Sequence, residues 1–312
     1  MIELRRLRLL RELRERGTIA AVADALAYTP SAVSQQLAAL EREAGVVLLE
    51  RVGRGVRLTD AAHRLAEHTD AVLSRLEQAE AELAATSGAV HGRVRIASFQ
   101  TAARSLVAPV LRPLSDRHEG LRLELLEMEA EEGLPRLRAG DVDIVIAEEY
   151  RAAPRPHERA LERVDLGRDR ILLALPPDHP EATGDGAGGG VSLRRLARDP
   201  WCSTREGTAF AAVLLRACRS AGGFEPDIRH RANDVALLVQ MAADGHGVTM
   251  VPALGQPEAH PGVAIRTVAG PALERRLYAA VRRGGAERPA VTATLDALRD
   301  RAAAIGLGPA RR

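Results

Sequence analysis

The sequence predicts an α/β protein built from three successive parts. Two helical runs, separated by Tyr28-Thr29-Pro30, lead into a hairpin pattern, and together they predict a winged helix-turn-helix over residues 1–59. One helical pattern then continues without a break and predicts a long linker helix over residues 60–88. Beyond it, strand and helix patterns alternate in two sets, which predicts two α/β lobes within residues 89–312.

Three helices and a hairpin make up the first part. Leucines at helical spacing form a first helix that ends at Gly17, and Thr18 can cap a second. A third helix runs from Pro30 to about Ala44. The segment VVLLERVGRGVRLTD then has β-forming residues on both sides of a glycine pair, which is typical of a short hairpin.

The third helix has two contrasting faces. At 100° per residue, Val33, Leu37 and Leu40 share a face that we expect to be buried. The opposite face carries small or hydrogen-bonding side chains and no acid, namely Ser31, Ser34, Gln35, Ala38 and Arg42. A helix that lies in the major groove of DNA needs such a surface, although an ordinary solvated face has a similar composition.

Basic side chains in the hairpin favour the DNA interpretation. Arg51, Arg54 and Arg57 lie there with no acid between them, so they can contact the phosphate backbone. Residues 1–59 hold ten arginines and seven acids, a net charge of only +3. The prediction therefore depends on where the charges lie and not on their total.

The linker helix carries an apolar stripe among acidic residues. Thr59 can cap it, and the stripe consists of Leu65, Val72, Leu76, Ala79 and Leu83. A single exposed helix of this length is marginally stable, so we expect the stripe to pack on a second copy of the chain. Packing on its own chain is the alternative.

The two lobes follow from two sets of strand patterns. VRIAS, LRLELLEM and VDIVIAEE form the first set, and RILLALPP, WCST, PDIRH and GVTMVP form the second, with helical patterns between them. Such alternation predicts parallel βαβ units. Ligands bind beyond the carboxyl ends of such strands, so we expect a cleft between the lobes.

Composition excludes several classes of chemistry. The chain has no lysine, and all 44 basic side chains are arginine. This excludes a Walker-A loop, a pyridoxal Schiff base and a Ser-x-x-Lys hydrolase. The sequence shows no other catalytic motif, and its histidines are scattered. We therefore expect no enzyme activity, no metal and no cofactor.

The two cysteines limit the possible zinc and redox chemistry, and the lack of long apolar runs argues against a membrane-spanning helix. Cys202 and Cys218 cannot form a four-cysteine zinc site, and we expect two buried inert thiols, with a redox switch as the alternative. No apolar run approaches the roughly 20 residues of a membrane helix. The charged N-terminus does not resemble a signal peptide, so we expect a cytoplasmic protein without a membrane partner.

At this point the sequence resembles a known family. The run from Leu4 to Thr59, centred on AVSQQLAALEREAGVVLLERVGRGVRLTDAA, is similar to the N-terminal domain of LysR-type transcriptional regulators. The remainder resembles their linker helix and their two-lobed effector domain, which is similar to periplasmic binding proteins. Asp199-Pro200-Trp201 and GHGVTMVP carry this second part of the resemblance.

The resemblance implies an architecture, partners and functional residues. Lobe 1 would comprise residues of about 92–164 and 268–303, and lobe 2 residues of about 165–267. The chain would dimerise through the linker helix, usually within tetramers, and bind double-stranded DNA under the control of a small-molecule effector. By position, the residues facing DNA would be Thr29, Ser31, Ser34, Gln35, Gln36, Arg51 and Arg54.

Two positions depart from the family pattern. Pro30 stands where many members have a base-contacting glutamine, and Gln35 often corresponds to an arginine. Proline has no side-chain donor, so base reading would shift towards Ser34, Gln35 and the hairpin.

In similar proteins the effector lies between the lobes, against two loops. Here these loops contain Ser98 and Thr101 in lobe 1, and Thr204 and Thr208 in lobe 2. Both lead into helix N-termini, which favour an anionic group, although Thr101 and Thr208 are equally suited to cap those helices.

Acidic residues end the neighbouring strands. Glu127 and Glu129 follow one strand, and Glu148 and Glu149 end the next. We therefore predict an amine-bearing or zwitterionic effector, with solvated loop acids as the alternative.

Three other functions are weighed against a regulator. An enzyme with a DNA-binding domain is disfavoured because the sequence shows no catalytic motif. A transport receptor is disfavoured because the N-terminus does not resemble a signal peptide. A winged helix that contacts only proteins would differ from a DNA-binding one in salt dependence, because DNA binding weakens steeply as salt rises.

Overall fold

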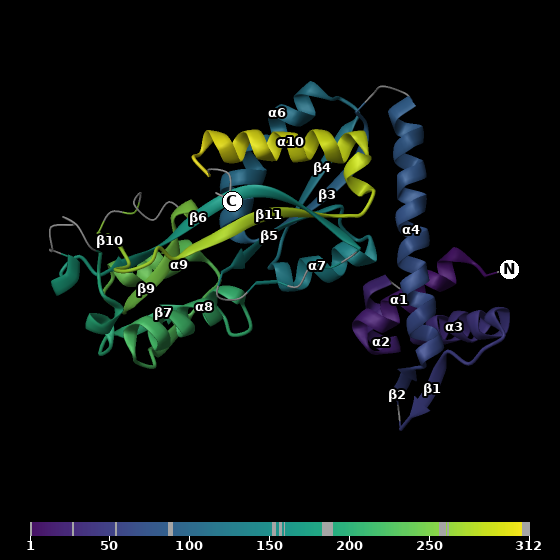
Figure 1. Ribbon diagram of the computed structural model, residues 1–312, viewed down its shortest axis with the longest axis horizontal. Coiled ribbons are helices and arrows are strands. Elements are labelled where there is room, and N and C mark those ends of the chain that lie inside the picture. Colours follow the sequence, from purple (N-terminus) through teal and green to yellow (C-terminus); the bar gives the residue numbers. More distant parts are fainter. Residues whose placement is uncertain are drawn as a thin grey trace.

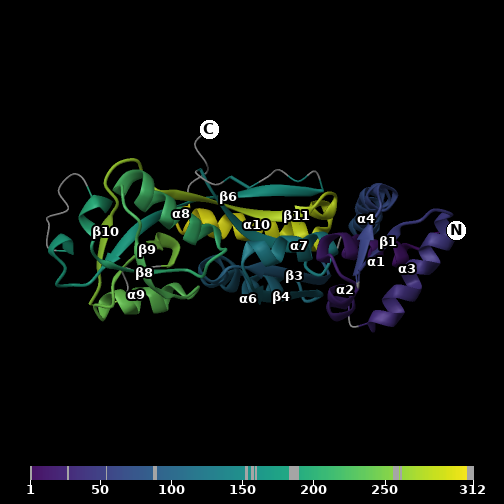
Figure 2. The ribbon, with the colours of Figure 1, turned by 90° about the horizontal axis from the view of Figure 1, so that it is seen from below.

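The structure is a computed structural model that describes residues 2–26, 28–53, 55–86, 90–151, 154–155, 158, 160–182, 190–255, 260 and 262–307. The winged helix-turn-helix occupies one end, lobe 1 the middle and lobe 2 the other end of an elongated molecule (Figures 1 and 2). None of the described helices is long and apolar enough to cross a membrane.

The N-terminal domain follows the predicted element order. Its elements are α1 (Leu4–Arg16), α2 (Ile19–Leu26), α3 (Pro30–Ala44), β1 (Leu49–Val52) and β2 (Gly55–Leu58). Gly17 and Gly45 end α1 and α3 in the left-handed conformation that glycine adopts most readily. Leu10, Leu37 and Leu40 lie at the centre of its core.

The linker helix α4 (Asp60–Thr86) packs on its own chain along part of its length. Thr59 caps it as predicted, since its hydroxyl accepts a hydrogen bond from the Ala62 amide at 3.2 Å. Leu73 is buried, whereas Val72 and Leu76 are 49% and 38% exposed. The helix therefore contacts α1 and lobe 1 and still presents apolar side chains to solvent. The side chain of Leu83, which the predicted stripe includes, lies outside the described residues.

The two lobes share one sheet. Lobe 1 contains β3 (Gly92–Ser98), α5 (Gln100–Ala102), the π-helical turn η1 (Ala103–Val107), α6 (Ala108–Arg117), β4 (Leu121–Glu127), α7 (Ala130–Ala139), β5 (Ile144–Tyr150), η7 (Gly285–Glu287) and α10 (Pro289–Ala304). Lobe 2 contains the short turns η2 (Pro180–Ala182) and η3 (Leu193–Leu196), then β7 (Pro200–Ser203), α8 (Ala209–Ala217), the π-helical turn η4 (Cys218–Gly222), β8 (Asp227–Arg231), α9 (Val235–Ala243), β9 (Val248–Pro252), η5 (Ala253–Gly255) and β10 (Ala264–Thr267).

Two long strands, β6 (Leu161–Leu175) and β11 (Glu274–Arg282), join the lobes. The described strands follow the order β4-β3-β5-β11-β6-β9-β7-β8, with β10 paired to β6. In lobe 1, α6 and α10 cover one face of this sheet and α7 the other (Figure 1).

The prediction of parallel strands is confirmed for part of the sheet and wrong for the rest. Strand β3 is parallel to β4 and β5, and β7 is parallel to β8 and β9. Strands β6, β10 and β11 pair antiparallel with their neighbours. The pattern RILLALPP also covers only the second half of β6, whose polar first half pairs with β11 in lobe 1. A strand that crosses between lobes meets two environments, so it lacks one uniform apolar pattern.

Gly247 sits where two strands of lobe 2 approach closely. A Cβ atom at this position would lie 2.5 Å from the carbonyl oxygen of Pro200, and φ is +154°. Pro200 begins β7, which carries the fully buried Trp201.

We therefore expect Gly247→Ala to destabilise lobe 2 by about 3 kcal/mol, because backbone must move to admit the methyl group. Gly245→Ala in the same lobe is the control, since its φ is also positive but no atom lies within 4 Å, and it should cost about 1 kcal/mol. Urea unfolding followed by fluorescence of Trp201, the single tryptophan, measures both. Equal losses in the two variants would contradict the steric argument.

Candidate DNA-binding surface and effector cleft

Helix α3 begins at a fixed point in the turn after α2. Thr29 adopts an extended conformation and its hydroxyl accepts a hydrogen bond from the Ala32 amide at 3.2 Å. Pro30 occupies the first helical position, where its fixed φ suits the helix and no amide hydrogen is needed. The same Thr29 hydroxyl lies 3.1 Å from the hydroxyl of Ser31. Thr29 therefore acts as a cap, whatever further contact it makes.

The two predicted faces of α3 are confirmed. Val33, Leu37 and Leu40 are at most 1% exposed and belong to the core of the domain. Ser31, Ser34 and Gln35 are exposed, as are Ala38 and Arg42. The exposed face thus carries hydroxyl and amide groups with no carboxylate among them.

Gln36 differs from its neighbours in its surroundings. Its side-chain oxygen accepts a hydrogen bond of 3.0 Å from Arg6 Nε, and the side chain is half-buried. Arg6 also pairs with Glu43 at the other end of α3. Gln36 therefore fixes α3 against α1, because its position on the helix points it between the two faces.

The hairpin is fixed to α3 by one carboxylate. Glu41 Oε1 accepts hydrogen bonds from the amides of Leu48 and Leu49 at 2.8 and 2.9 Å. Arg51 is exposed on β1 and has no ion-pair partner among the described residues. Arg57 on β2 instead pairs with Glu50 across the hairpin at 2.8 Å. The predicted contact Arg54 lies outside the described residues.

A small cleft lies between the lobes, at the carboxyl ends of β3 and β5. Its volume is about 30 Å³, room for little more than one water molecule. Four predicted effector residues line it, namely Thr101, Glu148, Thr204 and Thr208. They are joined by Phe99, Gln100, Glu129, Phe210, Asn233, Val235, Pro252 and Arg275.

Arg275 is the central cation of the cleft. It lies at the start of β11 opposite Asp169 of β6, and their side chains are 5% and 1% exposed. Arg275 Nε and Nη2 lie 2.9 and 2.7 Å from Asp169 Oδ2, and Nη2 donates to the Thr101 hydroxyl at 2.9 Å. The guanidinium also stacks 4.8 Å from the centre of the Phe99 ring. Thr101 is therefore an acceptor for Arg275 and does not cap α5, where Phe99 holds the cap position.

Two carboxyl groups in the cleft have raised pKa values. Glu148 is 4% exposed, and its Oε2 atom has no hydrogen-bond partner among the described residues. Burial raises the pKa of Glu148 above its usual range, against the opposing effect of Arg275 and Arg155. Burial, helped by the nearby charge of Glu148, also raises the pKa of Glu129 to about 7.

Contacts between the lobes close the cleft. Gln100 Nε2 of lobe 1 donates to Asp234 Oδ1 of lobe 2 at 2.7 Å. The same Asp234 oxygen caps α9 through the Ala236 amide at 2.9 Å. In lobe 2, Thr208 caps α8 through the Ala211 amide at 3.2 Å, and its hydroxyl lies 2.7 Å from that of Thr204.

Ser98 and Glu127 do not line this cleft, which corrects their predicted position. Ser98 is fully buried and its hydroxyl donates to the Phe99 carbonyl at 3.2 Å. Glu127 is exposed at the end of β4, one strand further from the lobe interface. Arg275 was missed because β11 follows a segment without a clear strand signal, although its ERRLYAAVR sequence contains aromatic and β-branched residues.

Both cysteines are free and buried thiols. Burial raises the pKa of Cys202, and burial together with Glu225 raises the pKa of Cys218 to about 12. Neither thiol is therefore appreciably ionised near neutral pH.

The geometry defines a class of protein before any comparison. A helix-turn-helix with an acid-free exposed helix face, followed by two lobes that close over a polar cleft, is the construction of a ligand-responsive DNA-binding regulator. Comparison with known families identifies the particular one. Residues 4–63 match the bacterial regulatory helix-turn-helix protein model of the lysR family, and residues 87–303 match the LysR substrate binding domain. The chain belongs to the LysR family of transcriptional regulators.

Individual relatives agree with this assignment. The chain is 29% identical over 296 residues to a probable HTH-type transcriptional regulator, LrrA, of Synechococcus elongatus, covering 95% of this chain and 96% of LrrA. It is 30% identical over 244 residues to a probable hydrogen peroxide-inducible genes activator of Mycobacterium leprae, covering 78% and 75% of the two chains. Its fold resembles that of a full-length OxyR variant from Pseudomonas aeruginosa, with a TM-score of 0.68, 21% identity, and coverage of 96% and 95%.

The buried pair between Arg275 and Asp169 yields a stability prediction. Asp169→Asn keeps the side-chain size but leaves a buried guanidinium without its counter-ion, so we expect a loss of about 3–5 kcal/mol in the free energy of unfolding. The matched control is Asp116→Asn, which removes the exposed partner of Arg112 at 2.7 Å and should cost at most about 0.5 kcal/mol. Urea unfolding of both variants measures this difference. Similar losses of unfolding free energy would contradict a large contribution of the buried pair to stability.

Proposed function

We propose that Ser31, Ser34 and Gln35 read base edges in the major groove while Arg51 and Arg54 contact the DNA backbone. The chain is a LysR-type regulator that binds specific DNA sequences under the control of a small-molecule effector. The observation that supports our assignment of residues is the exposed, acid-free face of α3 beside an exposed Arg51. Hydroxyl and amide groups offer the donors and acceptors that the major groove requires.

The assembly follows from the exposed part of α4. Regulators of this family form oligomers, and we propose that α4 of two copies pack together through Val72 and Leu76. These side chains are 49% and 38% exposed on a helix that packs elsewhere against α1 and lobe 1 of its own chain. We further propose that two such dimers form a tetramer, that the protein acts in the cytoplasm, where its DNA lies, and that it carries no catalytic activity.

For the effector, we propose an amine-bearing or zwitterionic compound. The observation that supports it is the buried Glu148 oxygen that lacks a hydrogen-bond partner, with Glu129 lining the same cleft. An ammonium group would donate to both carboxylates. A carboxylate on the same compound would lie near Thr204 and Thr208, where α8 begins.

Binding requires the lobes to separate. A cleft of about 30 Å³ cannot hold an amino acid, and the bond of 2.7 Å from Gln100 to Asp234 spans the lobe interface. An effector must therefore break the hydrogen bond between Gln100 and Asp234. The two lobes would then close around the effector at a larger separation than in this structure.

A response to peroxide receives no support from the two thiols. Several relatives, among them the Mycobacterium leprae protein, are named for peroxide-inducible genes. Peroxide reacts with a thiolate, whereas burial raises the pKa of both Cys202 and Cys218. We therefore favour reversible binding of an effector over oxidation.

The DNA assignment is tested by fluorescence anisotropy. DNA from upstream of the protein's own gene is compared with scrambled DNA at two salt concentrations. Ser34→Ala with Gln35→Ala should weaken specific binding by about 1–3 kcal/mol per lost base contact and leave non-specific binding nearly unchanged.

Arg51→Ala should weaken both kinds of binding and reduce the salt slope by about one. The control Arg112→Ala removes the same charge from an exposed site on lobe 1 and should change neither. The double variant at Ser34 and Gln35 could instead lose specific and non-specific binding to the same extent. That result would count against the proposal that this face of α3 reads base edges.

The effector class is tested by calorimetric titration with amino acids, amines and aromatic acids. Affinity for amines should rise about 10-fold from about pH 6 to about pH 8, because Glu129 ionises in this range while the ammonium stays charged. Glu148→Gln should weaken amine binding about 30-fold or more. Glu127→Gln is the matched control, since Glu127 lies outside the cleft. Binding of purely anionic compounds alone would refute the proposal.

A further inference from the structure

Helix α1 carries charged side chains on a side that is covered by other parts of the chain. The side chains of Arg11 and Glu12 are each 3% exposed, and those of the three charged residues that follow are about one-fifth to one-quarter exposed. Charged side chains are rarely buried to this extent unless they are paired. Helix α1 contacts α4 and, in lobe 1, α7. These elements therefore meet a charged surface of the DNA-binding domain.

Two rows of alternating charge run from α4 across α1 to lobe 1. The first row passes from Asp70 of α4 to Arg14 at 2.8 Å and then to Glu15 at 3.1 Å. Glu15 lies 3.0 Å from Arg138 of α7, which also holds Glu158 of lobe 1 at 2.8 Å. The second row contains, in order, Asp70, Arg11, Glu12, Arg16 and Asp141, separated by 3.8, 3.3, 2.8 and 3.4 Å.

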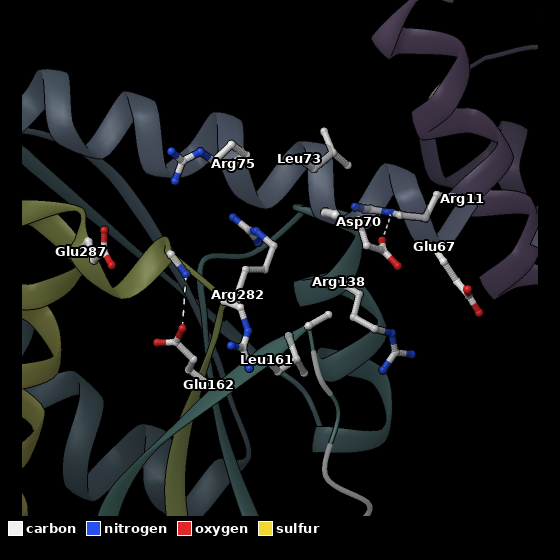
Figure 3. A pocket seen from close by; sticks show the side chains of 14 residues that line it. Arg11, Glu67, Asp70, Leu73, Arg75, Arg138, Leu161, Glu162, Arg282 and Glu287 are labelled. Carbon is white, nitrogen blue, oxygen red and sulfur yellow. Dashed lines mark hydrogen bonds and ion pairs between the residues drawn. The ribbon is translucent and has the colours of Figure 1, made fainter. Parts of the chain in front are cut away.

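Apolar packing does not join α1 to lobe 1 among the described residues. The hydrophobic cluster that contains the α1 leucines is confined to residues 7–65, and the clusters of lobe 1 include no side chain of α1. A cavity of about 790 Å³ separates α1 and α4 from the far ends of β6 and β11 (Figure 3). The described contacts between α1 and lobe 1 are therefore chiefly ionic.

We propose that the two rows form a clamp, which docks the DNA-binding domain on lobe 1 through charge and so fixes its orientation. Partly exposed ion pairs are individually weak, so loss of the two pairs that reach lobe 1 should release the domain. Helix α4 keeps its own contacts with η7 and α10, and the released domain would pivot there.

The docked domain keeps its predicted DNA-reading face free. Ser31, Ser34 and Gln35 of α3 are exposed although α1 is held against lobe 1. The clamp therefore does not block DNA. It sets the angle at which α3 is presented relative to the effector domain, and its release would allow other angles.

The test measures one distance across the boundary by double electron–electron resonance in the full chain without DNA. Spin labels are attached through Ala38→Cys on α3 and Arg112→Cys on α6, two exposed positions outside the clamp. The native thiols are buried and have raised pKa values, so they take up little label. Excess unlabelled protein ensures that only distances within one chain are recorded. We expect one narrow distance when the clamp is intact.

Two double variants remove the same two ion pairs from opposite sides. Glu15→Gln with Arg16→Gln acts on α1, and Arg138→Gln with Asp141→Asn acts on lobe 1. Each should broaden the distance distribution about twofold or more. The variant with all four changes should be no broader than either, because the same two pairs are already lost.

The matched control is Glu132→Gln with Arg136→Gln, which removes an ion pair of 2.7 Å within α7 and the same number of charges. It should keep the narrow distance. Fluorescence of the buried Trp201 checks that every variant is folded.

A narrow distance in either folded double variant would overturn the proposal, as would a broad distance with the clamp intact. Equal broadening in the control would overturn it too, because the change would then arise in α7 and not at the boundary. The measurement contains no DNA, so its outcome does not depend on the proposed base contacts.

Discussion

The structure depends on one buried ion pair, between Arg275 and Asp169. The two residues lie opposite each other on β11 and β6, the two strands that cross from one lobe to the other. Asp169 also accepts the Leu254 amide of lobe 2 at 2.9 Å, and Arg275 donates to Thr101 of lobe 1. The pair is therefore satisfied from both lobes, which is the condition under which buried charges are tolerated. It joins β6 to β11 beside the cleft, where the hydrogen bond from Gln100 to Asp234 also links the two lobes.

Arginine is suited to this role and lysine is not. The planar guanidinium holds Asp169, Thr101 and the face of Phe99 at the same time, with several donors fixed in one plane. Arg138 likewise holds two acids from different segments through separate nitrogens. A chain without lysine thus uses the same geometry repeatedly, wherever two parts of the fold must be held in a defined relation.

The sequence predicted the N-terminal domain more fully than the effector domain. Helix α3, its cap and its buried face follow from local periodicity, proline and glycine, which act within a few residues. The hydrogen bond from Arg6 to Gln36 joins residues 30 positions apart, and a helical wheel does not indicate it. In the cleft, Thr101 and Glu148 follow from strand ends, which topology brings together. Arg275 depends on a pairing between segments 106 residues apart, and no local pattern indicates it.

The two crossing strands also run from the effector cleft to the linker helix α4. Asp169 and Arg275 lie at the cleft, and the same antiparallel ladder ends with the pair of Leu161 and Arg282, which line a pocket between lobe 1 and α4 (Figure 3). The seven steps from Arg275 to Arg282 span about 24 Å of paired strand. Strand β11 pairs with β5 on one side and with β6 on the other, whereas β6 pairs with β9 and β10 only from Ile171 onwards. The same two strands therefore border both the effector cleft and α4, the helix that follows the DNA-binding domain.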